Sequence, residues 1–197
     1  MLETSAQAKF DLRPEIVVCV CDLEVAETLG EAAALREGLQ TARADRVDEA
    51  DPEALAGLLE RRVRDPACRA VLIVGRSRDG ETFRIQTRAE NRALGGRGRH
   101  LPTGPGIVRA TAPATEIARA LLDAGQSAEV SSDAEDDVAS YVLFRALCGL
   151  PDGVDAPSVG LLRVPAGDAD LAGAGVEAAM RAIARHMSPP AVRSPAS

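Results

Sequence analysis

Apolar runs of strand length alternate along the chain with stretches whose apolar residues recur at helical spacing. The runs PEIVVCVCDLE (residues 14–24) and CRAVLIVGR (residues 68–76) are almost continuously apolar, which is typical of strands buried on both faces of a sheet. DPEALAGLLERRVRD (residues 51–65) and APATEIARALLDAG (residues 112–125) place their apolar residues on one stripe, as amphipathic helices do. Asp51 and Pro52 favour the start of the first helix, and Gly125 favours the end of the second.

The remaining elements continue this alternation. Residues 25–42 have helical composition, residues 127–132 and 158–167 read as strands, and residues 133–150 and 171–187 read as helices. Residues 76–106 lose periodicity and fill with Arg and Gly, so we expect an excursion with one short strand within residues 82–91. This order predicts an α/β fold, a three-layer α/β/α sandwich with a mainly parallel or mixed central sheet.

Length and composition set the organisation of the chain. A chain of 197 residues with 46% hydrophobic residues can form one substantial core. We therefore expect a single α/β domain over residues 10–187. Residues 188–197 are rich in Pro and Ser and are expected to be a disordered tail.

Charge and cysteine content limit the classes of binding partner and the cellular compartment that we expect. The formal net charge of −7 argues against general binding to nucleic acid or to an anionic membrane, because both need clustered positive charge. The first residues are polar and no apolar run is long enough to span a bilayer, so we expect neither a signal peptide nor a membrane segment. Four dispersed cysteines do not suggest a disulfide framework. A cytoplasmic protein with reduced thiols is the expectation.

Four acidic residues crowd the start of the helix expected from residue 133. Asp133, Glu135, Asp136 and Asp137 precede the apolar run VASYVLF. A helix N-terminus stabilises nearby anions by roughly 0.3–1 kcal/mol each, so one interpretation is a heavily capped helix. The carboxylates, beside Ser131 and Ser132, could alternatively hold a divalent cation, although their spacing is not that of a known calcium loop.

The second half of the chain resembles a known family. The run TAPATEIARALLDAGQSAEVSSDAEDDVASYVLFRAL, followed by GLLRVPAG, is similar to the pyroglutamyl peptidase I family of cysteine peptidases, which remove N-terminal pyroglutamate. The positions in register are Thr111, Pro113, Ala124, Gly125, Val130, Ser131, Ala134, Val138, Gly160, Val164 and Pro165. The resemblance covers residues 70–187 and extends to the first 70 only through the order of strands and helices. It implies a fold that commonly self-associates, as a dimer, a tetramer or a mixed oligomer with a related subunit.

The departures from the family lie where its chemistry should be. The resemblance places the family's nucleophilic Cys at Ala139, its His at Arg163 and its Glu at Gln86, five residues before Asn91. Alanine cannot attack a carbonyl, and an arginine stays protonated and cannot act as a base. Cys21 and Glu24 stand where the family holds the pyroglutamate ring between two Phe side chains. We therefore expect a pseudo-peptidase with no intact catalytic residue, no metal and no cofactor.

A cleft without this chemistry can still bind a ligand. We expect Arg163 to pair with Asp133, Asp136 or Asp137, and to form a structural or ligand-binding ion pair. The candidate ligand-binding residues, for a small amide or peptide ligand, are Arg163, Ser132, Asp133, Asp136 and Asn91. The alternative is a hydrolase with altered chemistry in the same cleft, for example with Ser132 as nucleophile and His100 as base.

Three other features have both functional and structural interpretations. The arginines between Arg76 and Arg99 could gather an anionic ligand, or could pair with the acidic side chains of the chain. Cys19 and Cys21 lie two residues apart on a strand, so both thiols face one side, where they could bind a soft metal or lie in the core. Cys148 is expected to be a buried structural thiol, and His186 a favourable charge at the end of the last helix.

Overall fold

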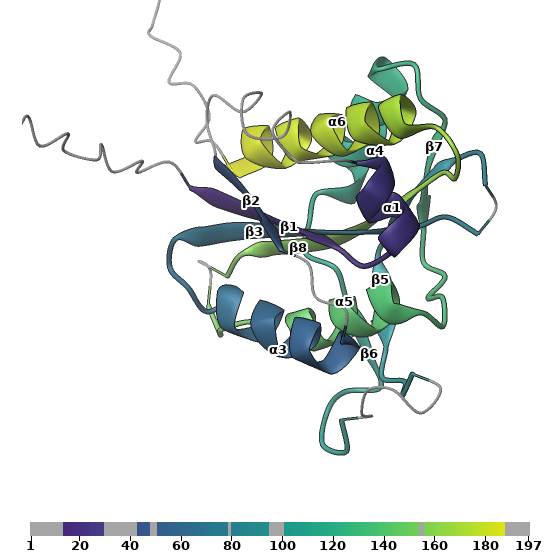
Figure 1. Ribbon diagram of the computed structural model, residues 1–197. Helices are drawn as coiled ribbons and strands as arrows, with labels where there is room; N and C mark the ends of the chain where they lie inside the picture. The colour runs from purple at the N-terminus through teal and green to yellow at the C-terminus, as the bar shows by residue number, and fades with distance from the viewer. Residues whose placement is uncertain are drawn as a thin grey trace, which may run out of the picture.

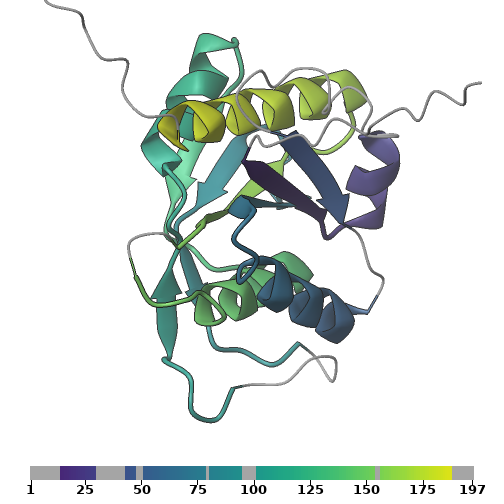
Figure 2. The same ribbon diagram turned by 90° about the vertical axis from the view of Figure 1, so that its left-hand side faces the viewer.

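In the computed structural model, helices cover both faces of a central sheet (Figures 1 and 2). The structure describes residues 14–29, 43–47, 51–78, 80–94, 101–153 and 156–187. The strands are β1 (Glu15–Val20), β2 (Arg43–Val47), β3 (Cys68–Arg76), β4 (Phe83–Gln86), β5 (Arg88–Glu90), β6 (Ile107–Arg109), β7 (Ala128–Ser131) and β8 (Ser158–Val164). The helices are α1 (Leu23–Thr28), α3 (Pro52–Arg62), α4 (Ala114–Asp123), α5 (Val138–Cys148) and α6 (Ala169–Met187).

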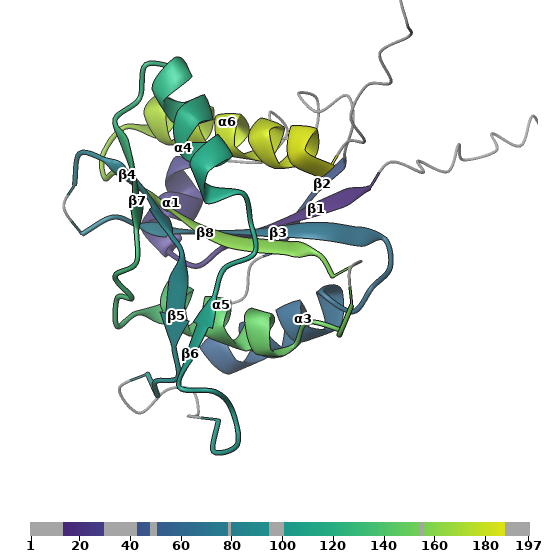
Figure 3. The ribbon, with the colours of Figure 1, turned by 180° about the vertical axis from the view of Figure 1, so that it is seen from behind.

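The central sheet is mixed and mostly parallel, as the sequence predicts. Its strand order is β2-β1-β3-β8-β4-β7, and only the contact between β4 and β8 is antiparallel. Helices α1, α4 and α6 cover one face, and α3 and α5 cover the other (Figure 1). A separate antiparallel pair, β5 and β6, lies beside α5, on the face of the central sheet that α3 and α5 cover (Figure 3). The three-layer α/β/α prediction is confirmed.

Two apolar cores on opposite faces of the sheet explain the continuous apolar runs. Along β3, Leu72 and Val74 belong to the core beneath α6, whereas Val71 and Ile73 belong to the core shared with α3 and α5. Successive side chains of a strand point to opposite faces. A central strand covered on both faces therefore needs apolar residues at every position.

The structure corrects the expected elements in three places. The segment 82–91 forms two strands, β4 in the central sheet and β5 in the small one, where one short strand was expected. Thr87 separates the two strands, and its hydroxyl donates a hydrogen bond to the carbonyl of Ser131 at 3.0 Å. Strands β2 and β6 were not predicted, because charged residues interrupt β2 and β6 is only three residues long. The helix expected over residues 25–42 is described only as α1, and the rest of that span lies outside the described residues.

The tail 188–197 and the candidate base His100 also lie outside the described residues. Within the part of the chain that the structure describes, no helix has the length and apolar character needed to cross a membrane.

Two glycines of α6 offer a matched test of its packing on the sheet. A Cβ at Gly175 would lie 2.2 Å from ring atoms of the buried Phe83 on β4, whereas a Cβ at Gly173 would meet no atom within 4 Å. We expect Gly175→Ala to lower the free energy of unfolding by about 1–3 kcal/mol, because the ring must shift in a packed core. Gly173→Ala should instead raise it by up to about 1 kcal/mol through helix propensity. Urea unfolding of the two variants measures both changes, and equal effects would contradict this packing.

Candidate functional site

Three residues form a row across the carboxyl ends of the central strands. Strand pairing sets Val20 opposite Val74 and Gly75 opposite Arg163, and the Cys21 amide donates a hydrogen bond to the carbonyl of Val74 at 2.9 Å. Cys21 directly after β1, Gly75 on β3 and Arg163 on β8 therefore follow one another across the sheet. Ligands of parallel α/β sheets generally bind beyond this edge of the sheet, so this row defines the candidate site.

Arg163 is the centre of the site and has no solvent exposure. Its Nε and Nη2 donate to Oε1 of Gln86 at 3.0 and 2.9 Å. Its Nη1 donates to the carbonyl of Arg76 at 3.1 Å, and its Nη2 also contacts Oγ of Ser140 at 2.8 Å. A buried guanidinium is costly unless its N–H groups are bonded, and every nitrogen of this one has an acceptor.

Asp137 neutralises the buried charge. Its two carboxylate oxygens accept hydrogen bonds from Nη1 and Nη2 of Arg163 at 2.6 and 3.1 Å, which is the bidentate arrangement that Arg and carboxylate groups favour. Asp137 is also the N-cap of α5 and accepts from the Ser140 amide at 2.9 Å. Burial opposes ionisation of Asp137, but its hydrogen bonds with Arg163, the Arg163 charge and the bonds with Ser140 prevail, so its pKa is lowered.

Gln86 is held in one orientation by the same cluster. Its Oε1 accepts from Arg163, while its Nε2 donates to the carbonyl of Arg88 at 2.7 Å and lies 3.2 Å from Oγ of Ser140. Gln86 is fully buried at the end of β4. Because each side of the amide has its own partners, Gln86 joins β4 to β8 and α5.

Ala139 lies against the same row. A Cβ built on Gly75 would come 2.8 Å from Cβ of Ala139 and 3.7 Å from Nη1 of Arg163. The glycine thus lets the start of α5 approach β3 closely. The structure brings together Gln86, Ala139 and Arg163, which come from three separate parts of the sequence.

Solved structures of pyroglutamyl peptidases, which are also called pyrrolidone carboxyl peptidases, share this architecture. A mutant pyrrolidone carboxyl peptidase from the hyperthermophile Pyrococcus furiosus superposes with a TM-score of 0.71 at 16% identity, over 88% of this chain and 100% of that chain. The chain has the fold of pyroglutamyl peptidase I. The enzyme of that name from Bacillus amyloliquefaciens matches with a TM-score of 0.71 at 15% identity, over 87% of this chain and 95% of that chain. No family model matches the sequence, and no curated protein matches it.

The other candidate ligand-binding residues do not gather around Arg163. Ser132, Asp133 and Asp136 are exposed, in the stretch between β7 and α5. Asn91 exchanges hydrogen bonds with the backbone of Leu101, donating at 2.8 Å and accepting at 2.9 Å. Among the acidic residues proposed for Arg163, the partner is Asp137, and neither Asp133 nor Asp136 takes that place.

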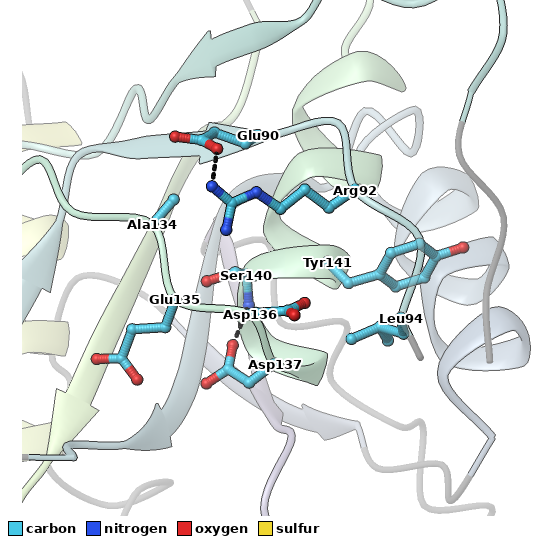
Figure 4. Close-up of a pocket in the computed structure, with 9 residues that line it drawn as sticks. All are labelled: Glu90, Arg92, Leu94, Ala134, Glu135, Asp136, Asp137, Ser140 and Tyr141. Carbon is cyan, nitrogen blue, oxygen red and sulfur yellow. Dashed lines mark hydrogen bonds and ion pairs between the residues drawn. The ribbon is translucent and has the colours of Figure 1, made fainter. Parts of the chain in front are cut away.

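The space beside the cluster is small. A cavity of about 10 Å³ lies next to the start of α5 (Figure 4), which is the room that about one water molecule needs. Glu90 and Arg92 line this cavity and form an ion pair with each other, drawn as a dashed line in Figure 4. Pockets for small organic ligands usually measure several hundred Å³, so this cavity is too small to hold such a ligand.

The thiols and the histidine lie in different surroundings. The sulfur atoms of Cys19 and Cys21 are 3.7 Å apart, as the strand spacing predicts. The pKa of Cys21 is raised well above its ordinary value. The hydrogen bond with Cys19 is the largest cause, and burial of the thiol is the second. His186 lies in the last turn of α6, 3.8 Å from Glu116, and Cys148 is half-buried. Among the residues that the structure describes, no three His, Cys, Asp or Glu side chains are placed to hold a metal ion.

Sequence reasoning missed Ser140 and Glu90. Ser140 carried a usable signal, because it is one polar residue in the buried run of α5 and stands three residues after a carboxylate that can cap the helix. Glu90 carried none, since a charged residue on a short strand is common on protein surfaces. Arg92 belongs to the arginine-rich stretch, and its ion pair with Glu90 agrees with the interpretation that these arginines pair with acidic side chains.

The depressed pKa of Asp137 predicts a pH-dependent stability. We expect Asp137→Asn to cost about 1–3 kcal/mol of unfolding free energy at neutral pH, through the weakened bond to Arg163. Asparagine is also a good N-cap, so the lost unfolding free energy measures the contribution of the negative charge of Asp137 and not of the helix cap. Because the folded pKa lies below the ordinary value of 3.8, the advantage of the wild-type protein should be complete above about pH 5 and disappear as the pH falls through the folded pKa.

The control for this measurement is Asp136→Asn, which removes the exposed carboxylate next to Asp137. Chemical unfolding at several pH values should show a small, nearly constant difference between Asp136→Asn and the wild-type protein. An Asp137→Asn cost that stayed constant down to pH 2, about two units below the ordinary pKa, would contradict the ion pair.

Proposed function

We propose that this protein is a pyroglutamyl-peptidase-like protein that has lost peptidase activity and acts as a binding, regulatory or partner subunit. The observation that carries the proposal is the state of Arg163. It stands where the resemblance implies the catalytic His, and it is fully buried with its N–H groups bonded to Asp137, Gln86, Ser140 and the Arg76 carbonyl. A side chain in this state has neither the free lone pair nor the access that a general base needs.

The family resemblance also implies that the nucleophile and the group that orients the base have been replaced. Peptide hydrolysis by a cysteine peptidase requires a thiolate, a base and a group that orients the base. Ala139 provides no thiol, and the amide of Gln86 provides no carboxylate to orient an imidazole. The nearby Cys21 thiol has a pKa well above its ordinary value, so it is protonated at neutral pH and a poor nucleophile.

The partner role follows from the same family resemblance. We propose assembly as a dimer or tetramer, or as a mixed oligomer with a related subunit, in the cytoplasm. The exposed Leu122 at the end of α4 and Val130 on the edge strand β7 are consistent with a contact surface there. A small amide or peptide is the ligand class that an inherited cleft would take.

The second candidate is a hydrolase with altered chemistry in the same cleft, acting on a small amide or an N-terminal pyroglutamyl-type substrate. One observation favours it: the Cys21 thiol lies in the row that also contains Arg163, at the edge of the sheet. Turnover that depends on Cys21 would distinguish this candidate from the first.

The proposal predicts no release of a fluorophore from a pyroglutamyl amide by the purified wild-type protein. The triple variant Gln86→Glu, Ala139→Cys, Arg163→His restores the implied catalytic set, and any activity it gains should depend on the new thiol. The matched control is Gln86→Glu, Arg163→His with Ala139 retained, which should be inactive. Wild-type turnover above a buffer blank, abolished by Cys21→Ser, would contradict the loss of activity and support the second candidate.

A further inference from the structure

Glu135 is a buried carboxylate surrounded by three arginines. Its side chain is only 7% exposed. One oxygen, Oε2, lies 3.0 Å from Nε of Arg78 and 3.4 Å from Nη1 of Arg163, and the other, Oε1, lies 3.5 Å from Nη1 of Arg84. Neither oxygen has a hydrogen-bond partner, because the N–H groups of these arginines do not point at it. The positive charges of the three arginines therefore neutralise the carboxylate, but no hydrogen bond holds it in place.

The three arginines direct their hydrogen bonds elsewhere. Arg163 bonds Asp137 and Gln86, and Arg84 donates to Glu129 at 2.7 Å. Arg78 donates to the backbone carbonyl of Asp136 at 3.4 Å. A buried acceptor without a hydrogen bond is unfavourable. Glu135 is thus the weakly held carboxylate of this cluster, in contrast to Asp137 with its bidentate bond.

We propose that Arg78, Arg84 and Arg163 form a binding site for the carboxylate of a small organic acid, which Glu135 fills in the closed state. The inference deepens the proposed function and rests on it, since it gives the binding protein a ligand class. Three guanidinium groups face the carboxylates of Asp137, Glu129 and Glu135. Displacement of Glu135 leaves one excess positive charge, and a planar carboxylate matches the fork of a guanidinium.

Access to the site does not require unfolding of a helix. Glu135 lies in the irregular stretch between β7 and α5, and α5 begins only at Val138. Figure 4 shows its side chain pointing away from Asp136 and Arg92. The Arg78 side chain is 61% exposed and forms the solvent side of the cluster. Rotation of Glu135 toward solvent would therefore open the arginines to an incoming acid.

Acetate is the probe, because Glu135→Ala removes a CH2–COO⁻ fragment of the same size. At constant ionic strength, kept with NaCl, we expect acetate to raise the melting temperature of Glu135→Ala saturably. The neutral isostere acetamide should not do so. The wild-type protein should respond less, because its own carboxylate competes. Adding Arg84→Gln to Glu135→Ala should weaken acetate binding by about tenfold, the loss of one charged contact.

Glu135→Gln keeps the shape of the side chain, and it replaces Glu135→Ala in the acetate measurement if Glu135→Ala does not fold. Its amide competes less well for three arginines than a carboxylate, so its response to acetate should exceed that of the wild-type protein. Equal shifts with acetate and acetamide, or equal responses of wild type and variant, would overturn the inference. The readout is binding, so wild-type turnover of a pyroglutamyl amide would refute the proposed function without affecting this result.

Discussion

The bidentate bond between Arg163 and Asp137 is the interaction on which the rest of the site depends. A guanidinium with no exposure destabilises the fold unless a carboxylate neutralises it and its remaining N–H groups find acceptors. Those acceptors come from Gln86 on β4, the Arg76 carbonyl on β3 and Ser140 on α5. One side chain of β8 therefore links two neighbouring strands and the start of a helix.

In the proposed function, the bonds that stabilise this edge of the sheet also remove reactivity from it. A hydrolytic site needs a nucleophile and a base that can reach a substrate, whereas here the polar groups of the cluster bond one another beside a cavity of about 10 Å³. The chain shares its fold with solved pyroglutamyl peptidases at 15–16% identity. A fold maintained by apolar strands and covering helices does not depend on its site residues, and therefore does not guarantee their chemistry.

The sequence predicted the elements that carry a strong pattern. Strands β1, β3 and β8 and helices α3, α4, α5 and α6 follow from apolar runs and stripes. Strands β2 and β6 do not, because charged residues interrupt β2 and β6 has only three residues. The meeting of Gln86, Ala139 and Arg163 was implied by resemblance alone, since no local pattern joins positions so far apart. The sequence of the acidic run before α5 does not show which of its carboxylates pairs with Arg163. Asp137 does so because α5 begins at Val138 and Asp137 is its N-cap, and Glu135 is buried by the packing of the folded chain.

The most direct test of the account is covalent labelling by a pyroglutamyl chloromethyl ketone, followed by intact-mass and peptide mass spectrometry. The account predicts no labelling that free pyroglutamate suppresses, because the closed site lacks a thiolate and the Cys21 thiol is protonated. Stoichiometric labelling of one cysteine, suppressed by pyroglutamate, would show an open pocket with an active nucleophile. That result would contradict the central claim that Arg163 and Asp137 have replaced catalysis with a closed ion pair.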